Sequence, residues 1–580
     1  MAVGVPAYGS PRPRQDLSRL RLVWLLALAL LMAGVIEARL AYWQVVQHRQ
    51  LQNAAEEQYS KQVGLPASRG VILDRNLRPL AVNTTVYSVF LSPDQVPVEA
   101  RERVAVSLGS VLGVPPGDVM ALLQSDRKFG YVARRQTLAK AEQLRALKLP
   151  GVGLQAEEQR SYLPGGIPGT TLAANLIGFV NYDGAGQRGV EEFYNARLAG
   201  KPGYMTTYRD LANREIVLGT RTRVDPVNGQ SLVLTLDSGI QYLAEQAIAD
   251  GVKAAKAESG TVLIMDPHTG GILAWADYPS YDANAFPRTD PNLFSDPAVS
   301  YLFEPGSVMK VVTLAGAIDS GAITPGTVIN DPGYAVVGGY RISDWDRRNH
   351  GSITYTYVLE HSLNVGAIKA MQAEGEPAFY HYLQAFGLTG PSGVDVAAEA
   401  SMPLEASKMG AAQYATAAFG QGIGVNAVQM LAAINVVANG GRYAQPHVVE
   451  RAGGAPTPLA TAAQRQAVSA TSARQMTQMM ESVVQHGSGW TARVKGFELD
   501  QTGKTGTAQI PVNGRYTDDV WASYVGFLPS DNPRFTMLVV IRKPHNDYWM
   551  HNDGYYVAAP VWKRLAEAMV LQWRITPDPR

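Results

Sequence analysis

Residues 311–318, with the sequence Val-Val-Thr-Leu-Ala-Gly-Ala-Ile, form an apolar run without a charged side chain, which a folded domain has to bury. The run follows Glu304-Pro305-Gly306-Ser307-Val308-Met309-Lys310, and Pro and Gly before a Ser predict that a helix starts there. A helix that is apolar almost all round is typical of the interior of a large domain. The chain has 580 residues, 46% of them hydrophobic, which allows such an interior and more than one domain.

Ser307 and Lys310 are three positions apart, so on a helix they share one face. A lysine in the first turn of a buried helix is disfavoured by the helix dipole and by desolvation, and both effects push its amine toward the neutral form. A hydroxyl beside a neutral amine is a nucleophile with a candidate base. The alternative is that Ser307 caps the helix and the Lys310 side chain extends to solvent.

Leu22–Ile36 is a second apolar run, close to the N-terminus. As a helix, its roughly 15 residues span about 22 Å, less than the ~30 Å hydrocarbon layer of a membrane. Arg19 and Arg21 at one end, and Tyr42 and Trp43 at the other, can bridge the difference. A cleaved signal peptide is the alternative, but no small-x-small cleavage site follows and the helical pattern continues. Because arginines precede the run, the sequence predicts a cytoplasmic tail at 1–21, a transmembrane anchor at 22–43, and the rest of the chain outside the plasma (inner) membrane.

Residues 44–220 carry short strand, helix and turn patterns without a catalytic set of side chains, which predicts a mixed α+β, non-catalytic module. Within it, residues 47–61 are polar and helix-prone, and residues 97–149 suggest two or three amphipathic helices. Arg69, Asp74 and Arg75 predict a structural ion-pair cluster.

Residues 221–575 begin and end with strand patterns and are helical between them. Strands are expected at 230–236, 260–267, 271–276, 504–510, 521–527 and 535–541, and helices at 240–255 and 559–572. This order predicts an α+β domain in which an antiparallel sheet packs beside a helical lobe.

Composition excludes several kinds of function. The chain has no cysteine, which rules out disulfides, thiolate catalysis and cysteine metal sites. Its 9 histidines show no paired-ligand spacing, so neither a metal nor another cofactor is expected. A net charge of +1 argues against a nucleic-acid partner.

Two further motifs follow the Ser-x-x-Lys pair. Ser362-Leu363-Asn364 lies in the helical region, and Lys504-Thr505-Gly506-Thr507 lies on a predicted strand. Each is unspecific alone, but the three in this order and context are the set found in penicillin-binding proteins and serine β-lactamases. With the anchor, the chain resembles a class B penicillin-binding protein, a membrane-anchored peptidoglycan D,D-transpeptidase.

The resemblance extends over nearly the whole chain. It includes Arg69-Gly70-x-Ile72-x-Asp74-Arg75, Gly186-x-x-Gly189-Val190-Glu191, Asp266-Pro267-x-Thr269-Gly270, Gly420-Gln421-Gly422 with Asn439-Gly440-Gly441, and Val525-Gly526-Phe527-x-Pro529. Two positions depart from the family pattern, since Leu77 stands where Gly is usual and Asn426 where Thr is usual. The implied architecture is an N-terminal transmembrane helix, an elongated α+β pedestal of the dimerisation type, and a transpeptidase domain like those of penicillin-binding proteins and serine β-lactamases.

The resemblance also implies roles for the motif residues. Ser307 would attack the carbonyl between the two terminal D-alanines of a stem peptide, and Lys310 would take its proton. Ser362 would relay a proton to the leaving amine, and Asn364 would hold the substrate amide and the Lys310 head group. Lys504 and Thr505 would bind the substrate carboxylate, and Gly506 would let the backbone approach the substrate. The backbone N–H groups of Ser307 and Thr507 would form the oxyanion pocket.

The implied ligands and partners are peptidoglycan stem peptides, β-lactams, a membrane glycan polymerase of the SEDS type and other cell-wall synthesis proteins. Phe303 before the Glu-Pro-Gly-Ser segment and Leu80-Ala81-Val82 favour the septal, cell-division branch over the elongation, cell-shape branch. A β-lactamase or β-lactam sensor with the same motifs, and a non-catalytic scaffold that keeps the fold, are the competing interpretations.

Overall fold

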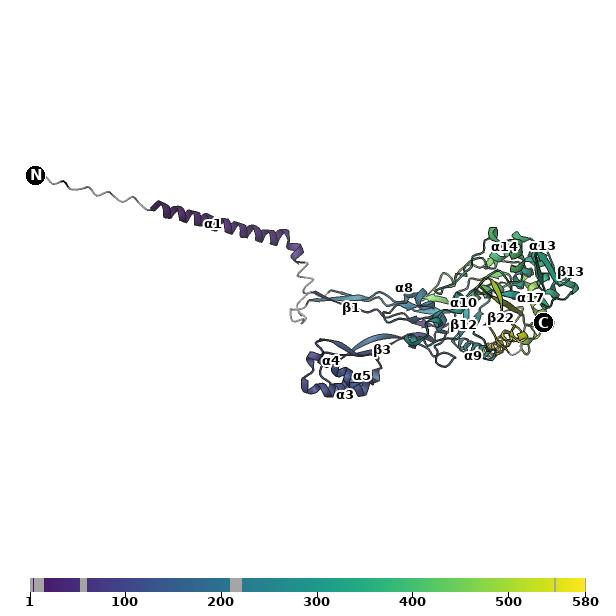
Figure 1. Cartoon of the computed structure of the whole chain (residues 1–580), viewed down its shortest axis with the longest axis horizontal. Coiled ribbons are helices and arrows are strands. Elements are labelled where there is room, and N and C mark those ends of the chain that lie inside the picture. The colour runs from purple at the N-terminus through teal and green to yellow at the C-terminus, as the bar shows by residue number, and fades with distance from the viewer. Residues whose placement is uncertain (1–3, 5–14, 53–59, 209–221, 547–548, 579–580) are drawn as a thin grey trace. The chain divides into compact units, whose positions relative to one another are not determined.

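The computed structural model describes residue 4 and residues 15–52, 60–208, 222–546 and 549–578. The chain divides into two compact units (Figure 1). One contains residues 1–67 and 201–227, and the other contains residues 68–200 and 228–580.

In the first unit, α1 (Gln15–Ala41) continues into a π-helical turn, η1 (Tyr42–Val46). The stretch Arg19–Val46 contains 28 residues, or about 40 Å of helix, and is apolar enough to cross a membrane. A three-stranded antiparallel sheet completes this unit, in the order β1 (Ser60–Leu65), β8 (Gly203–Tyr208) and β9 (Thr222–Val224). The helix expected over 47–61 is present at 48–52, but a strand begins at Ser60; residues 53–59 lie outside the described residues.

A five-stranded sheet forms the centre of the second unit. Every neighbouring pair is antiparallel, as the sequence predicts. The order is β12 (Ile272–Tyr278), β11 (Ser259–Met265), β23 (Phe535–Arg542), β22 (Arg515–Leu528) and β21 (Lys504–Val512).

Alternate residues of this sheet pack into two different cores, because successive side chains of a strand point to opposite faces. On β11, Val262 and Ile264 pack in one core with side chains of α9 (Ser238–Ala254) and α18 (Ala558–Trp573). Leu263 and Met265 pack in the other core, with a helical lobe. The main helices of that lobe are α11 (Lys310–Asp319), α13 (Asn364–Glu374), α16 (Ala427–Ala438) and α17 (Ala470–His486). The predicted α+β fold is therefore confirmed.

Residues 97–149 contain three α-helices, within the predicted number. They are α3 (Arg101–Leu112), α4 (Pro116–Gln124) and α5 (Leu138–Leu147), which lie beside strand β3 (Pro79–Leu91) and share a small core with it (Figure 1). A strand that the sequence did not indicate, β4 (Gly130–Gln136), separates the second helix from the third. It pairs with β3, whose other edge along this stretch pairs with β5 (Val152–Tyr162).

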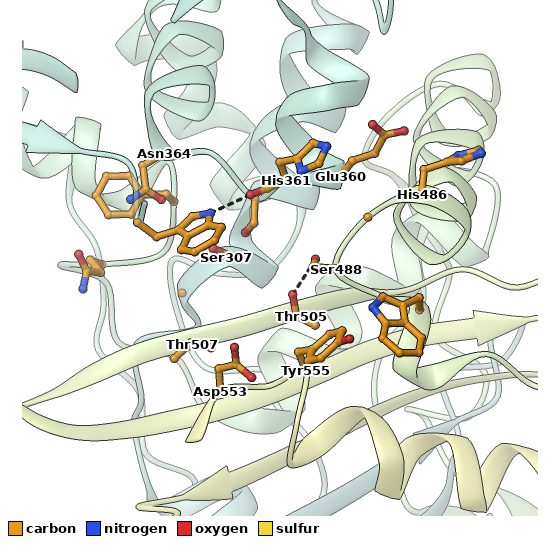
Figure 2. A pocket seen from close by; sticks show the side chains of 17 residues that line it. Ser307, Glu360, His361, Asn364, His486, Ser488, Thr505, Thr507, Asp553 and Tyr555 are labelled. Atoms are coloured by element: carbon orange, nitrogen blue, oxygen red, sulfur yellow. Dashed lines mark hydrogen bonds between the residues drawn. The ribbon is translucent and has the colours of Figure 1, made fainter. Parts of the chain in front are cut away.

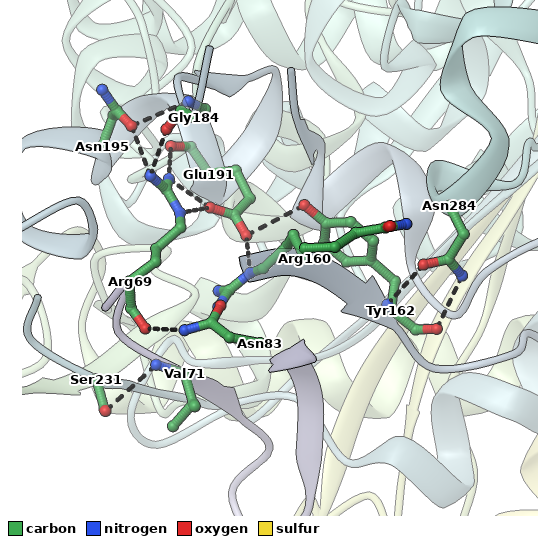
Figure 3. A network of polar contacts seen from close by, with 12 residues as sticks. Arg69, Val71, Asn83, Arg160, Tyr162, Gly184, Glu191, Asn195, Ser231 and Asn284 are labelled. Atoms are coloured by element: carbon green, nitrogen blue, oxygen red, sulfur yellow. Dashed lines mark hydrogen bonds and ion pairs between the residues drawn. The ribbon is translucent and has the colours of Figure 1, made fainter. Parts of the chain in front are cut away.

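The buried Glu191 joins two arginines that are far apart in the sequence (Figure 3). Its carboxylate lies 2.5 Å from Nη2 of Arg69 and 2.8 Å from Nε of Arg160. The prediction that Arg69 forms an ion-pair cluster with Asp74 and Arg75 is therefore wrong, because Arg69 pairs with Glu191. Asp74 instead accepts a hydrogen bond of 2.6 Å from the Ser238 hydroxyl at the start of α9.

The two departures from the family pattern have clear structural consequences. Leu77 adopts the left-handed backbone conformation, with φ of 62°, that a glycine would take without strain. Asn426 caps α16, because its Oδ1 accepts a 2.8 Å hydrogen bond from the Gln429 N–H. Its Nδ2 also donates to Glu399 and Ala400, which a threonine could not do.

Candidate active site

Ser307 lies on a 3₁₀ turn, η6 (Gly306–Met309), which runs directly into α11. Its hydroxyl does not cap the helix and instead accepts a 2.9 Å hydrogen bond from Nζ of Lys310. The Lys310 side chain is completely buried. The interpretation in which Ser307 is a cap and Lys310 extends to solvent is therefore wrong.

Two glycines hold this turn in place. Gly306 has a φ of 57°, and its N–H donates to the Gly420 carbonyl at 3.0 Å. A Cβ on Gly420 would lie 2.1 Å from the Gly306 carbonyl oxygen. A Cβ on Gly306 would lie 2.8 Å from the carbonyl oxygen of Thr507 on β21. Close backbone contacts on both sides therefore fix the position of Ser307.

Lys310 is surrounded by oxygen atoms. Besides Ser307, its Nζ lies 2.6 Å from the Ser362 carbonyl oxygen, 3.4 Å from the Ser362 hydroxyl and 2.9 Å from Oδ1 of Asn364. Burial, and then the nearby charge of Lys504, hold the pKa of Lys310 well below its usual range, while Asp344 opposes this shift. This lowered pKa favours the neutral amine, which is the form that can accept a proton from Ser307.

The second motif turns sharply at Ser362, which has a left-handed backbone with φ of 58°. Asn364 begins α13, and Oδ1 of Asp344 accepts hydrogen bonds from the N–H groups of Asn364 and Val365, at 2.6 and 3.0 Å. Nδ2 of Asn364 donates to the Ser343 carbonyl at 3.0 Å, which leaves Oδ1 of the amide pointing to Lys310.

Lys504, at the start of β21, is also completely buried. Its Nζ lies 2.9 Å from the Ser362 hydroxyl and 2.9 Å from the Thr505 carbonyl oxygen. Burial lowers the pKa of Lys504 to about 7. The Ser362 hydroxyl therefore contacts both amines, and a continuous chain of polar contacts joins Ser307, Lys310, Ser362 and Lys504.

These groups lie at a cleft of about 620 Å³ (Figure 2). Ser307, Ser362, Asn364, Thr505 and Thr507 line it. The hydroxyls of Thr505 and Ser488 lie 3.0 Å apart on its wall. The structure thus gathers at one cleft all three motifs that the sequence singled out.

The structure gives a packing reason for Gly506, and its expected role beside the substrate stays a prediction. A Cβ at this position would lie 2.4 Å from Oγ of Ser523, 2.8 Å from Cγ2 of Val308 and 2.9 Å from the Pro305 carbonyl oxygen. The glycine therefore lets β21 pack against the turn that carries Ser307.

Several residues of the site have no signal in the sequence. Asp344, which fixes Asn364, lies in a stretch without a pattern, 20 positions away. Trp345, Glu360, His486, Ser488 and Trp490 line the cleft from separate loops and helix ends. Trp345 and Trp490 are 71% and 54% exposed, so each presents aromatic surface to a ligand in the cleft. Nothing in the local sequence reveals that exposure.

Within the described ranges, no three His, Asp or Glu side chains are grouped so that they could hold a metal ion. Hydroxyls, amines and an amide are the groups that the three motifs bring together, and these are the groups that serine acyl transfer needs.

Comparison with known proteins agrees with this geometry. Residues 260–567 match the model of the penicillin binding protein transpeptidase domain, and residues 64–234 match that of the penicillin-binding protein dimerisation domain. The chain is 32% identical over 555 residues to penicillin-binding protein PbpB of Mycobacterium tuberculosis, covering 89% of this chain and 79% of the relative. It is 30% identical over 562 residues to peptidoglycan D,D-transpeptidase FtsI of Escherichia coli, covering 96% and 91%.

Two solved structures are also similar to this chain over most of its length. A peptidoglycan synthetase from Bifidobacterium adolescentis superposes with a TM-score of 0.71 at 26% identity, over 90% of this chain and 98% of that one. Penicillin binding protein 3 of Mycobacterium tuberculosis, solved with aztreonam, superposes with a TM-score of 0.68 at 26% identity, over 89% and 98%.

Proposed function

Because the chain belongs to the class B penicillin-binding proteins, which are peptidoglycan D,D-transpeptidases, we propose that Ser307 is its nucleophile and that it cross-links stem peptides during septal wall synthesis. The observation that carries the proposal is the chain of contacts through Ser307, Lys310, Ser362 and Lys504 at one cleft.

Acylation begins with proton transfer. Lys310, whose pKa burial lowers, accepts the Ser307 proton as Oγ attacks the carbonyl between the two terminal D-alanines. The N–H groups of Ser307 and Thr507 stabilise the oxyanion, and each such donor is worth about 3–4 kcal/mol. Asn364 holds the Lys310 amine and the substrate amide.

The leaving D-alanine carries a free carboxylate and needs a proton on its amine. The protonated form of Lys504 and the Thr505 hydroxyl bind the carboxylate. The Ser362 hydroxyl, in contact with both lysine amines, passes a proton to the leaving nitrogen. An acceptor amine then attacks the acyl-enzyme and forms the cross-link.

A β-lactam acylates the same serine by the same reaction. No leaving group departs from this acyl-enzyme, so the acyl-enzyme persists. The relative from Mycobacterium tuberculosis has been solved with aztreonam and with ampicillin. We extend β-lactam binding to this chain at Ser307, because its cleft holds the three motifs typical of penicillin-binding proteins.

The competing β-lactamase or sensor activity predicts rapid turnover of nitrocefin, whereas the transpeptidase predicts one slow turnover per chain. A non-catalytic scaffold would not be acylated at all. The match to the dimerisation domain and the apolar N-terminal helix favour the transpeptidase.

We place residues 1–21 in the cytoplasm, the anchor at 22–43, the pedestal at 44–220 and the transpeptidase domain at 221–575, outside the plasma membrane. The four arginines before the apolar run support this orientation, which cysteine labelling from either side of the membrane would test. A SEDS-type glycan polymerase, contacting the anchor and pedestal, and other cell-wall synthesis proteins are the proposed partners. The adjacent Ala33 and Gly34 would allow close approach of another helix.

The septal role and the elongation role differ in phenotype. Depleting the protein should turn cells into filaments if it acts in division, and into spheres if it acts in elongation. Filaments are the outcome that we expect from the residues around Ser307 and Leu80-Ala81-Val82.

Labelling with a fluorescent penicillin tests the nucleophile. Ser307→Ala should lose the label while remaining folded. Ser320→Ala is the matched control, because that serine lies just after the same helix and its hydroxyl hydrogen-bonds to the nearby Ala317 carbonyl and Ala322 N–H. A label that persists on Ser307→Ala would show that another residue is acylated.

A further inference from the structure

The cleft extends beyond the place where the departing D-alanine of the donor stem peptide binds. This argument rests on the proposed function, in which Lys504 and Thr505 hold the carboxylate of the departing D-alanine. The hydroxyls of Thr505 and Ser488, 3.0 Å apart, then mark the leaving-group side of the cleft. In Figure 2, Ser307 lies on one side of this pair and His486 lies on the other. An amine that replaces D-alanine has to enter from the His486 side of the pair. The reason is that the amine attacks, and D-alanine departs, at the same face of the carbonyl.

Glu360 and His486 line the cleft on that side, at the ends of α12 (Tyr355–Glu360) and α17. Oε1 of Glu360 accepts a hydrogen bond from the Ser482 hydroxyl, and that hydroxyl lies 3.2 Å from Nδ1 of His486. The Ser488 N–H donates to the Glu360 carbonyl at 3.1 Å. The Glu360 side chain is thus anchored at one oxygen, while Oε2 has no hydrogen-bond partner in the described part of the chain.

The charges along the cleft have one sign. Glu360 and Asp553 are its acidic lining residues, and no described lining residue is a lysine or an arginine. Lys310 and Lys504 have no exposed side-chain surface, and Lys504 is already assigned to the carboxylate of the departing D-alanine. The exposed ring of Trp490, packed edge-on against Tyr555 at 5.5 Å, adds an aromatic face that also attracts cations. A cleft lined by carboxylates concentrates cations at its mouth.

We propose that the part of the cleft formed by Glu360, His486, Ser488 and Trp490 is the acceptor groove, and that Glu360 recognises the ammonium group of the incoming stem peptide. The groove would favour an amine whose carbon bears no free carboxylate, such as that of lysine or of an amidated diamino acid. An amine with a free carboxylate beside it would meet repulsion from Glu360, and no lysine or arginine among the described lining residues would offset that repulsion.

The chemistry of the step is an aminolysis that balances without another reactant. The acceptor ammonium gives one proton to water, and its nitrogen then attacks the acyl carbonyl. The new C–N bond forms, the bond from the carbonyl carbon to Oγ of Ser307 breaks, and the second proton passes to that Oγ. Glu360 contributes by drawing the cation into the groove and orienting it, not by accepting these protons.

A purely structural role for Glu360, holding α12 against Ser482 of α17, predicts different behaviour. Glu360→Gln keeps an oxygen that accepts the Ser482 hydrogen bond, so it preserves that role and removes only the charge. Glu360→Asp keeps the charge on a shorter side chain. Glu405→Gln is a matched control, since Glu405 is exposed and its carboxylate pairs with Lys408.

The test uses the full chain in detergent with an N-acyl-D-alanyl thioester as donor and three acceptor peptides that differ in one residue: lysine, diaminopimelic acid and its amide. For the lysine and amide acceptors, Glu360→Gln should raise the acceptor KM by about fivefold, the limit expected for a partly exposed ion pair. Glu360→Asp should recover most of this loss, and Glu405→Gln should match the wild type. The wild-type KM for these acceptors should also rise with salt, and that dependence should weaken in Glu360→Gln.

Thiol release from the donor without an acceptor should be the same in all four proteins. Normal thiol release together with an unchanged acceptor KM in Glu360→Gln would contradict the assignment of the acceptor groove and leave the proposed function standing. A wild-type chain that uses the free-carboxylate acceptor as well as the amide would also contradict it. A wild-type chain that releases no thiol would contradict the proposed function itself.

Discussion

Gly506→Ala tests how β21 positions the nucleophile. The added Cβ would lie 2.4 Å from Oγ of Ser523 and 2.8 Å from Cγ2 of Val308, which are both buried side chains. The third contact, 2.9 Å from the Pro305 carbonyl oxygen, is with backbone just before Ser307. Restoring an ordinary separation requires the strand and the turn to move apart by about 0.5 Å.

Misplacing a reacting group by about 1 Å costs roughly a hundredfold in rate, so a shift of half that size should slow acylation by about tenfold. Overpacking should also lower the free energy of unfolding by about 1–3 kcal/mol. The assay is stopped-flow acylation by a chromogenic β-lactam, combined with denaturant unfolding. Gly326→Ala is the control, because a Cβ there meets nothing within 4 Å. Acylation of Gly506→Ala at the wild-type rate would refute this account of the glycine.

Three other predictions concern charge and backbone strain. The acylation kcat/KM should fall at low pH as Lys310, whose pKa burial lowers, becomes protonated, and should fall again above about pH 7 as Lys504 loses its proton; a flat profile would contradict both roles. Leu77→Gly should raise the free energy of unfolding by up to about 1 kcal/mol, because glycine removes the cost of a left-handed leucine, and a loss of stability in denaturant titration would contradict this. Glu191→Ala should destabilise the protein by about 3–5 kcal/mol, because Arg69 and Arg160 lose their shared carboxylate, and calorimetry that shows an unchanged melting temperature would contradict it.

The fold could be predicted where side-chain periodicity reports burial directly. Strands β11, β22 and β23 and helices α9 and α18 follow runs or periodic patterns of apolar residues that a sheet or a packed helix requires. Strand β4 could not be found in this way. Its central sequence, Val-Ala-Arg-Arg, is partly exposed and charged, and its conformation depends on pairing with β3.

The three motifs of the site were visible because each is a short local sequence. The geometry that makes them reactive was not, because it depends on contacts between distant segments. Lys310 and Lys504 meet the same Ser362 hydroxyl, yet Lys504 lies 142 positions from that serine. Glu191 pairs with Arg69 across 122 positions. Pairings between residues so far apart in the sequence depend on the tertiary fold. The local sequence therefore predicted Asp74, and not Glu191, as the partner of Arg69.

The central claim is that a stem peptide acylates Ser307 with loss of one D-alanine. Its most direct test mixes the full-length protein with a pentapeptide ending in D-alanyl-D-alanine, quenches the reaction with acid and measures the intact mass before peptide mapping. The account predicts one adduct per chain, lighter than the pentapeptide by one D-alanine, on the peptide that contains Ser307, and none on Ser307→Ala. An adduct on another residue, or an unchanged adduct on Ser307→Ala, would contradict it.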